Sequence, residues 1–234
     1  MTDTDSSERP KIFVWDLPVR VMHWSFLLLV IGAWATRELP GEWFVWHVRI
    51  GYAIFVLVAT RIVWGVLGTR YARFVDFVRG PSAVLRYLRG VSAQHYAGHN
   101  PAGGWMVVLL LLLLLTQAVT GLFANDQISE TGPLFGYVTV DRSDFLTTLH
   151  KLGFKVIQAA VALHIAAVLF HLIARRENLL RPMLDGAKSA GIVPQGAVGI
   201  DGSRVIHALV IAAIWSVALW WVVRSAPEAS LFAF

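Results

Sequence analysis

The sequence predicts an all-α integral membrane protein, in which a bundle of four transmembrane helices is followed by a fifth, C-terminal transmembrane helix. Of the 234 residues, 56% are hydrophobic and only 15% are charged, whereas soluble domains carry about 25% charged residues. Five apolar windows of about 20 residues are long enough to cross a bilayer as helices. The lysines and arginines are also divided unequally between the loops, as is typical of membrane helices with a fixed orientation.

The five windows are separated by polar connections. We expect the helices at residues 17–36, 48–67, 104–123, 149–174 and 205–223. Asp16 and Pro18 suit the N-cap and first turn of the first helix, and Asn100 and Pro101 suit those of the third. The third window is nearly all leucine and is predicted to be a scaffold or lipid-facing helix. The predicted divisions are an N-terminal segment (1–16), a four-helix domain (17–188), and a linker with the fifth helix (189–234).

The positive charges predict the orientation of the bundle. One side, which holds the N-terminus and the second and fourth connections, has thirteen lysines and arginines: Arg9, Lys11, Arg20, Arg70, Arg73, Arg79, Arg86, Arg89, Arg175, Arg176, Arg181, Lys188 and Arg204. The other side has six: Arg37, Arg49, Arg142, Lys151, Lys155 and Arg224. Arg61 lies within the second helix. By the positive-inside rule, the N-terminus is cytoplasmic and the C-terminus is outside.

The composition also excludes several classes of protein. Cysteine is absent, which excludes disulfides, cysteine-ligated zinc, iron–sulfur clusters and haem attached through Cys-x-x-Cys-His. The first twenty residues are polar and the apolar segment that follows is too long for a signal peptide, so we expect no cleaved leader. The net charge of +5 reflects the loops and does not indicate nucleic acid; the expected contact surface is membrane lipid.

Four of the eight histidines form a pattern. His23 lies near the cytoplasmic start of the first helix, and His47 at the outer start of the second. His150 is at the outer start of the fourth helix, and His164 follows fourteen residues later. Fourteen helical residues turn about 1400°, which leaves an offset of about 40°, and rise about 21 Å. His150 and His164 therefore share a helix face but are too far apart for one metal ion.

This spacing predicts two separate sites, one in each leaflet. His47 lies level with His150, and His23 is closest in depth to His164. A six-coordinate haem b takes two axial nitrogens, commonly from different helices. We therefore predict two haem b groups, each held by one histidine pair.

Neighbouring residues fit this interpretation. Gly51 follows His47 by one turn, where the lack of a side chain would let a porphyrin approach the backbone. Arg61 suits a propionate or a quinone, or it snorkels. Three cations flank the histidines and suit haem propionates: Arg20, Arg49 and Lys151. Three aromatic side chains could line the rings: Trp24, Trp46 and Phe154.

Other placements stay open at this point. A single intramembrane histidine can simply hydrogen-bond a helix carbonyl. His171 is nearly in phase with His164 and could replace it as the inner ligand, but it would separate the haems by about 31 Å, close to the hydrocarbon thickness, so we favour His164. His95 and His99 are expected at the cytoplasmic surface, with a quinone or propionate contact as the alternative. His207 is expected at the membrane interface.

Several separated motifs occur in a recognisable order. They are VWDLPVRVMHW, WHVRIGYAIFVLVATRIVWGVLG, RYARFVDFVRGP, GHNPAGG and LHKLGFKVIQAAVALHIAAVLFHLIARRENLLRPMLDGAK. Over about residues 11–188, these segments resemble the bacterial cytochrome b561 and nickel–iron-hydrogenase b-type cytochrome family. The fifth helix and His171 go beyond the minimal pattern.

The resemblance implies a four-helix core in the bacterial inner membrane, with two b haems that exchange electrons with quinone. It carries the ligand role onto His23, His47, His150 and His164. The family includes subunits that accept electrons from hydrogenases, cytochromes that serve soluble c-type cytochromes, and a superoxide:quinone oxidoreductase. The resemblance alone therefore leaves the branch, and with it the redox partner, open.

We predict electron transfer between the quinone pool and a redox partner at the outer, periplasmic face, such as a c-type cytochrome or a hydrogenase. One rival is superoxide oxidation with quinone as acceptor. The other is a haem-free transporter or assembly anchor that uses its histidines as proton relays. No catalytic residue is assigned.

The charge of the third connection bears on the outer partner. Residues 124–149 carry one arginine, Arg142, and four acids, which gives −3: Asp126, Glu130, Asp141 and Asp144. An acidic surface attracts a basic protein and repels the superoxide anion. The loop therefore favours a protein partner.

Overall fold

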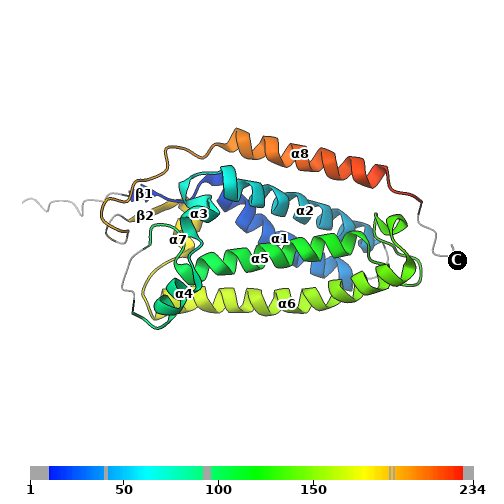
Figure 1. Ribbon diagram of the computed structural model, residues 1–234, viewed down its shortest axis with the longest axis horizontal. Coiled ribbons are helices and arrows are strands. Elements are labelled where there is room, and N and C mark those ends of the chain that lie inside the picture. Colours follow the sequence, from blue (N-terminus) through cyan, green and yellow to red (C-terminus); the bar gives the residue numbers. More distant parts are fainter. Residues whose placement is uncertain (1–10, 40–41, 92–95, 190, 192, 229–234) are drawn as a thin grey trace, which may run out of the picture.

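Five long helices run side by side along the long axis of the molecule (Figure 1). The computed structural model describes residues 11–39, 42–91, 96–189, 191 and 193–228. The long helices are α1 (Leu17–Glu38), α2 (Trp43–Leu67), α5 (Pro101–Leu122), α6 (Val140–Ile173) and α8 (Val205–Arg224). Each is long and apolar enough to cross a membrane. The predicted fold class, an all-α integral membrane protein, is confirmed.

Short elements gather at the two ends of the bundle (Figure 1). One end holds β1 (Lys11–Phe13), the 3₁₀ turn η1 (Arg70–Ala72), α3 (Phe74–Phe77), α4 (Pro81–Leu88), α7 (Leu180–Asp185) and β2 (Ala187–Ser189). The other end holds the 3₁₀ turn η2 (Phe135–Tyr137). The first end is the one that the charge distribution predicts to be cytoplasmic, and it is called the inner end below.

An antiparallel strand pair, which the sequence analysis did not predict, closes the inner end. Phe13 of β1 lies opposite Ala187 of β2, and Lys11 lies opposite Ser189. The segment before α1 and the segment after α6 therefore lie at the same end. Four membrane crossings between them require this arrangement.

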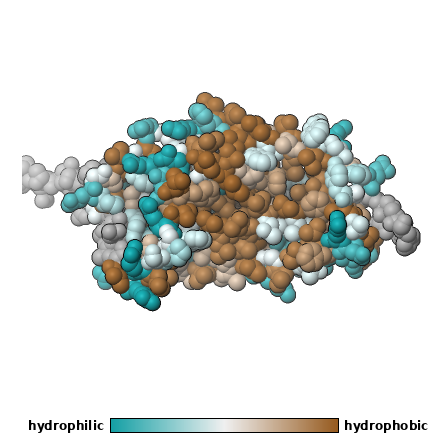
Figure 2. Space-filling model, viewed as in Figure 1, coloured by the Kyte–Doolittle hydropathy of each residue, from teal (hydrophilic) through white to brown (hydrophobic). Residues whose placement is uncertain are grey.

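The surface reflects the bilayer. A hydrophobic band crosses the middle of the molecule, and hydrophilic residues collect toward both ends (Figure 2). Large apolar side chains such as Leu28 of α1 and Ile206 and Trp221 of α8 are exposed. A helix satisfies its own backbone hydrogen bonds, so such side chains can face lipid directly. The chain is thus a multi-pass membrane protein.

Three of the helices share the central core. Val58 of α2, Leu114 of α5 and Ile157 of α6 are buried in one cluster. The leucine-rich α5 is therefore a scaffold on one face, while its exposed Leu109 and Leu112 lie on the other. This outcome agrees with the role predicted for the third window.

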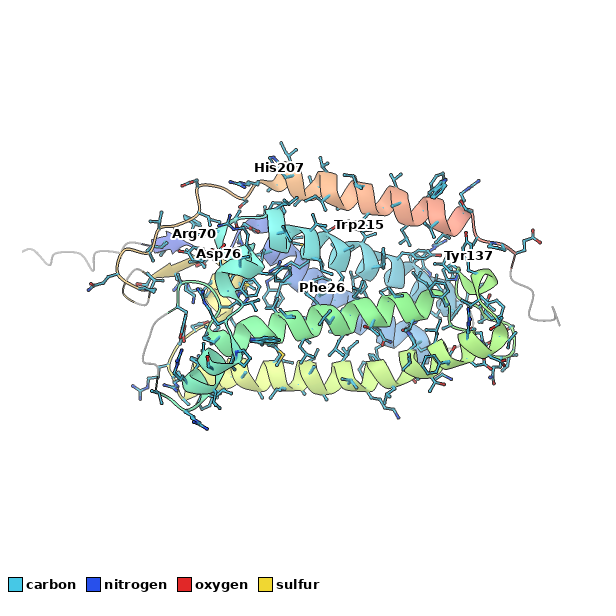
Figure 3. All side chains as sticks on the ribbon, viewed as in Figure 1. Phe26, Arg70, Asp76, Tyr137, His207 and Trp215 are labelled. Carbon is cyan, nitrogen blue, oxygen red and sulfur yellow. The ribbon has the colours of Figure 1, made fainter. Side chains whose placement is uncertain are left out.

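The last helix packs along α2. Trp215 points from α8 toward α2 (Figure 3), where its ring meets Phe55 edge-on at 6.2 Å between centroids. At the other end of α8, the Tyr137 hydroxyl donates to the carbonyl of Ser225 at 2.9 Å. α8 is thus attached to the bundle at its middle and at its C-terminal end.

The helix starts follow from local chemistry. Asp16 accepts a hydrogen bond from the Val19 amide at 2.7 Å, and Asn100 accepts one from the Gly103 amide at 2.7 Å, so both predicted N-caps are confirmed. By contrast, α6 begins at Val140, nine residues before the expected position 149. The charged residues of its first turns lower the hydropathy there, but a helix continues as readily outside the bilayer as inside it.

Asp16 also joins two helices. Its carboxylate is 1% exposed and accepts from the Trp64 indole at 3.0 Å and from the Thr69 hydroxyl. The start of α1 is thereby fixed to the end of α2. Three donors depend on this one side chain.

We expect Asp16→Ala to lower the free energy of unfolding by about 3 kcal/mol, because it removes a helix cap and leaves buried donors without an acceptor. Thermal unfolding in detergent measures the effect. Asp16→Asn, which keeps one acceptor oxygen, should lose less stability. Asp201→Ala, at an exposed site, should leave the unfolding temperature almost unchanged. An unaltered unfolding temperature for Asp16→Ala would contradict the assignment.

Candidate cofactor sites

Four histidines from three helices form two pairs in space. The ring centroids of His47 and His150 are 6.2 Å apart, with an angle of 85° between the rings. The centroids of His23 and His164 are also 6.2 Å apart, with an angle of 61°. The structure thus brings together the partners that helix phase and depth predict, one pair in each half of the bundle.

The separation within each pair suits a shared metal ion. A bond between a metal and an imidazole nitrogen is about 2 Å long, and the ring centroid lies about 1 Å beyond the nitrogen, so two ligands on opposite sides have centroids about 6 Å apart. Within the described ranges, no group of three or more His, Cys, Asp or Glu side chains could hold a metal. Two facing histidines with no third protein ligand suit axial ligation of a haem.

The outer pair has the hydrogen bonds expected of metal-binding histidines. The Nδ1 atom of His47 lies 2.8 Å from the carbonyl oxygen of Ala33, and that of His150 lies 2.9 Å from the carbonyl oxygen of Gln117. A carbonyl can only accept, so each Nδ1 carries the hydrogen. The lone pair of each ring is therefore on Nε2, and the carbonyl fixes the ring orientation, as is common for metal ligands.

Helix α5 completes the outer site, which the sequence analysis did not predict. The Gln117 side chain lies 3.2 Å from Nε2 of His150. A Cβ atom added to Gly121 would lie 2.8 Å from the His150 ring, and one added to Gly153 would lie 2.6 Å from Gln117. Small residues thus let these groups approach. The available signal was the amide that interrupts the leucine run.

The space beside α2 is open one turn beyond His47. A Cβ atom added to Gly51 would meet no atom of the described chain within 4 Å. This observation fits the predicted role of Gly51 as the place where a flat group lies against the helix.

The inner pair is bordered by polar groups from the α7 region. Trp24 lies edge-on to His23 at 5.2 Å and donates to the Met183 carbonyl at 3.1 Å. Arg20 donates through Nη1 to the Leu184 carbonyl. In the part of the chain that the structure describes, Nε of Arg20 and Nδ1 of His23 are buried and have no hydrogen-bond partner.

Arg61 lies within the bundle, as predicted. Its side chain is 5% exposed, and its guanidinium lies 5.6 Å from the centre of the Phe74 ring. Among the described residues, its Nη1 has no hydrogen-bond partner. A buried guanidinium of this kind is costly unless an acceptor is bound.

The expectation that His99 is a surface residue is wrong. Its ring packs between Trp15 and Phe77, at 4.6 Å from each ring centroid. Burial, and then the positive charges of Arg61 and Lys188, lower the pKa of His99 to about 3, so the ring is neutral at physiological pH. Its buried Nδ1 lacks a partner within the described chain. The burial of His99 could not be predicted from the loop sequence, because the aromatic residues that pack against it are distant in the chain.

The inner end thus gathers buried nitrogen atoms without hydrogen-bond partners in the described chain; those of the arginines are donors, and those of the histidines are donors in the tautomer that carries the hydrogen on Nδ1. Such groups cost about 1–3 kcal/mol each when unsatisfied. The four nitrogen atoms belong to Arg20, His23, Arg61 and His99. Carboxylate or carbonyl oxygens would satisfy them, so the inner end fits a group that carries such oxygens.

The remaining predicted residues lie further from the pairs or at the surface. Arg49 is exposed and stacks over Trp46 at 5.0 Å, and Trp46 itself is half exposed. Lys151 is exposed and Phe154 is half-buried. His207 is exposed near the start of α8 (Figure 3).

His171 does not lie opposite His23. One ring nitrogen, Nε2, is 3.1 Å from the Tyr87 hydroxyl, and the other, Nδ1, is 3.1 Å from the Glu177 carboxylate. The ring that faces His23 is that of His164. His95 and Arg9 lie outside the described residues.

The sequence is similar to those of known proteins. A family model described as prokaryotic cytochrome b561 matches residues 14–186. A probable Ni/Fe-hydrogenase B-type cytochrome subunit of Rhodobacter capsulatus is 28% identical over 218 residues, which cover 77% of this chain and 82% of the relative. The probable Ni/Fe-hydrogenase 1 B-type cytochrome subunit of Escherichia coli K12 is 24% identical over 212 residues, which cover 76% and 90%.

The match extends from the segment before α1 to the end of α7, and so includes all four paired histidines. The resemblance seen in the sequence motifs is confirmed. This chain belongs to the prokaryotic cytochrome b561 family, whose members are b-type cytochromes that bind haem b and transfer electrons.

Proposed function

We propose that the protein is a di-haem cytochrome b that transfers electrons between a redox partner at the periplasmic face and the quinone pool of the bacterial inner membrane. The observation that carries this proposal is the presence of two histidine pairs, each with ring centroids 6.2 Å apart. His150 and His164 place these pairs about 21 Å apart along α6. Haems bound at these two depths would provide a path for electrons across the membrane.

His47 and His150 would hold the outer haem, and His23 and His164 the inner one. Haem supplies reversible one-electron chemistry when bound. The Ala33 and Gln117 carbonyls hold the outer imidazoles in the correct tautomer, and Gly51 leaves room beside α2.

Arg20 and Arg61 would bind the carboxylates of the inner haem, because their buried donors suit anionic oxygens. His99 would donate to a quinone oxygen: its neutral ring can carry the hydrogen on Nδ1, which is buried. At the outer end, Arg49 and Lys151 would bind the carboxylates of the other haem. They are exposed, as groups at a membrane surface are.

A nickel–iron hydrogenase is the partner that we favour. The relatives named above are hydrogenase B-type cytochrome subunits, and the alignments cover more than four fifths of their length. The acidic outer segment also suits a c-type cytochrome with a basic docking surface, so that partner is the second candidate. Superoxide, an anion, fits this segment less well.

The optical spectrum of the purified protein tests the proposal. We expect a reduced b-type α band and two haems per chain, and we expect added quinone to reoxidise the reduced haems. A protein without a Soret band would leave the transporter or anchor alternative. A protein that reduces quinone rapidly with superoxide would establish the catalytic alternative.

The proposed orientation predicts the activity of fused reporters. A reporter that is active only outside the cytoplasm should be active after Phe234 and silent within residues 185–202, because the loops with thirteen positive residues stay inside. The opposite pattern would place the quinone-side residues at the periplasmic face.

The acidic outer segment predicts steering of a basic partner. The rate of electron exchange with a basic c-type cytochrome should fall as salt rises, because surface charges are screened beyond about 10 Å at 0.1 M ionic strength. Neutral amides at four positions should flatten this dependence: Asp126, Glu130, Asp141 and Asp144. If the amide variants keep the native salt dependence, the segment is not the docking surface.

A further inference from the structure

A chain of four titratable side chains runs along the inner end, outside the proposed haem sites. The Tyr87 hydroxyl of α4 lies 3.1 Å from Nε2 of His171, and Nδ1 of His171 lies 3.1 Å from Oε2 of Glu177. The other oxygen of Glu177, Oε1, lies 3.8 Å from Nζ of Lys188. The chain joins α4, the end of α6 and β2, which are distant in sequence.

The donors and acceptors in this chain have a defined order. A carboxylate can only accept, so Nδ1 of His171 carries a hydrogen and donates it to Glu177. In the neutral ring, Nε2 then accepts from the Tyr87 hydroxyl. His171 thus holds one oxygen of Glu177 in place, and the other oxygen faces Lys188.

Glu177 is the most exposed of the three side chains that are paired by charge, and Lys188 is the most buried. The Glu177 side chain is 33% exposed, His171 is 12% exposed and Lys188 is 4% exposed. Lys188 donates to the Tyr96 carbonyl at 3.2 Å. Burial lowers the pKa of Lys188, and the charge of Glu177 opposes that shift. A lysine with a lowered pKa takes up and releases protons more readily than an exposed one.

The buried end of the chain approaches the inner site. Lys188 donates to Tyr96, three residues before His99 in the chain, and the positive charges of Arg61 and Lys188 both act on His99. Lys188 therefore links a partly exposed carboxylate, Glu177, to the segment that carries His99. A purely structural ion pair would not require a gradient from solvent to this pocket.

We propose that Glu177 and Lys188, held by His171 and Tyr87, form the route by which protons pass between the inner aqueous phase and the quinone that exchanges electrons with the inner haem. This inference rests on the proposed function. Reduction of a quinone to a quinol requires two electrons and two protons. The electrons come one at a time from the outer redox partner through the haems, and each quinone oxygen gains one proton delivered from water through Glu177 and Lys188.

The test compares two acceptors in the purified, haem-loaded protein. Glu177→Gln and Lys188→Met should slow haem oxidation by a water-soluble quinone at least tenfold and raise the solvent deuterium isotope effect. Oxidation by ferricyanide, which takes up no proton, should keep its native rate. A small weak acid such as formic acid, supplied as a formate buffer, should restore part of the quinone rate in Glu177→Gln.

Asp76→Asn is the matched control. Asp76 is at the same end of the molecule (Figure 3), is 29% exposed, and pairs with Arg73 at 2.7 Å rather than with the chain. It should keep the native rate with both acceptors. The haem spectrum and the unfolding temperature of each variant report whether the substitution has disturbed the fold.

The outcomes distinguish a failure of the proton route from a failure of the proposed electron transfer to quinone. Native quinone rates and isotope effects in both chain variants would overturn the proton route and leave the proposed function intact. An equal loss of the haem oxidation rate with ferricyanide would mean that the four side chains have a structural role and would also overturn the route. So would a loss of the quinone rate that no weak acid restores. A native protein that binds two haems but never reacts with quinone would overturn the proposed function, and the route with it.

Discussion

Replacing His47 or His150 with alanine is expected to leave about one haem per chain, and the haem that remains is the inner one. Replacing His23 or His164 is expected to leave the outer haem. Each pair has ring centroids 6.2 Å apart, and in the proposed assignment each pair would hold one haem, so removal of either member would affect one site only. Haem content per chain, measured on the reduced pyridine complex, and redox titration of the α band report which haem is lost.

His171→Ala and His207→Ala are the controls for this experiment, and both should keep two haems. His171 has both ring nitrogens engaged with Tyr87 and Glu177, and His207 is exposed on α8. If His171→Ala loses a haem while His164→Ala keeps both, the inner ligand is His171 and the pairing at that end is wrong.

Arg61→Met is expected to lower the reduction potential of the inner haem by about 60 mV, which corresponds to about 1.4 kcal/mol for one electron. The guanidinium is buried, and a nearby positive charge stabilises the reduced haem more than the oxidised one. An interaction of this size is expected for a unit charge about 10 Å away at an effective dielectric constant near 20. Arg61→Met would also remove the proposed contact with a haem carboxylate and should weaken retention of the inner haem.

Arg61→Lys, which keeps the charge, should restore most of the potential. The outer haem provides an internal reference, because it lies about 21 Å further along α6 and its potential should change little. Equal shifts at both haems would indicate a general change in the fold, and no shift at either would remove Arg61 from the inner site.

The parts of the structure that could be predicted from sequence depend on periodicity. Helix phase and rise place His150 and His164 on one face at two depths, and the same reasoning finds His47 and His23 as their partners. The N-caps at Asp16 and Asn100 are equally local, because a cap depends on residues three positions apart. Hydropathy found all five spanning helices for the same reason.

The parts that could not be predicted depend on contacts between distant segments. His99 is in a polar loop, and only the folded chain brings Trp15 and Phe77 to its two faces. The role of Gln117 could not be predicted because it depends on the packing of α5 against α6, which brings its side chain to His150. The early start of α6 was missed because hydropathy reports where the bilayer ends, and a helix can extend into water.

The pairing of β1 with β2 sets an order for biosynthesis. β1 is synthesised before α1, but its partner, Ala187–Ser189, follows only after four of the long helices have been made. The ligands of the outer pair are complete once residue 150 has been synthesised, whereas the inner end is closed by residues up to 189. The outer pocket can therefore mature first, and the inner pocket stays open at its end of the bundle until the strands join.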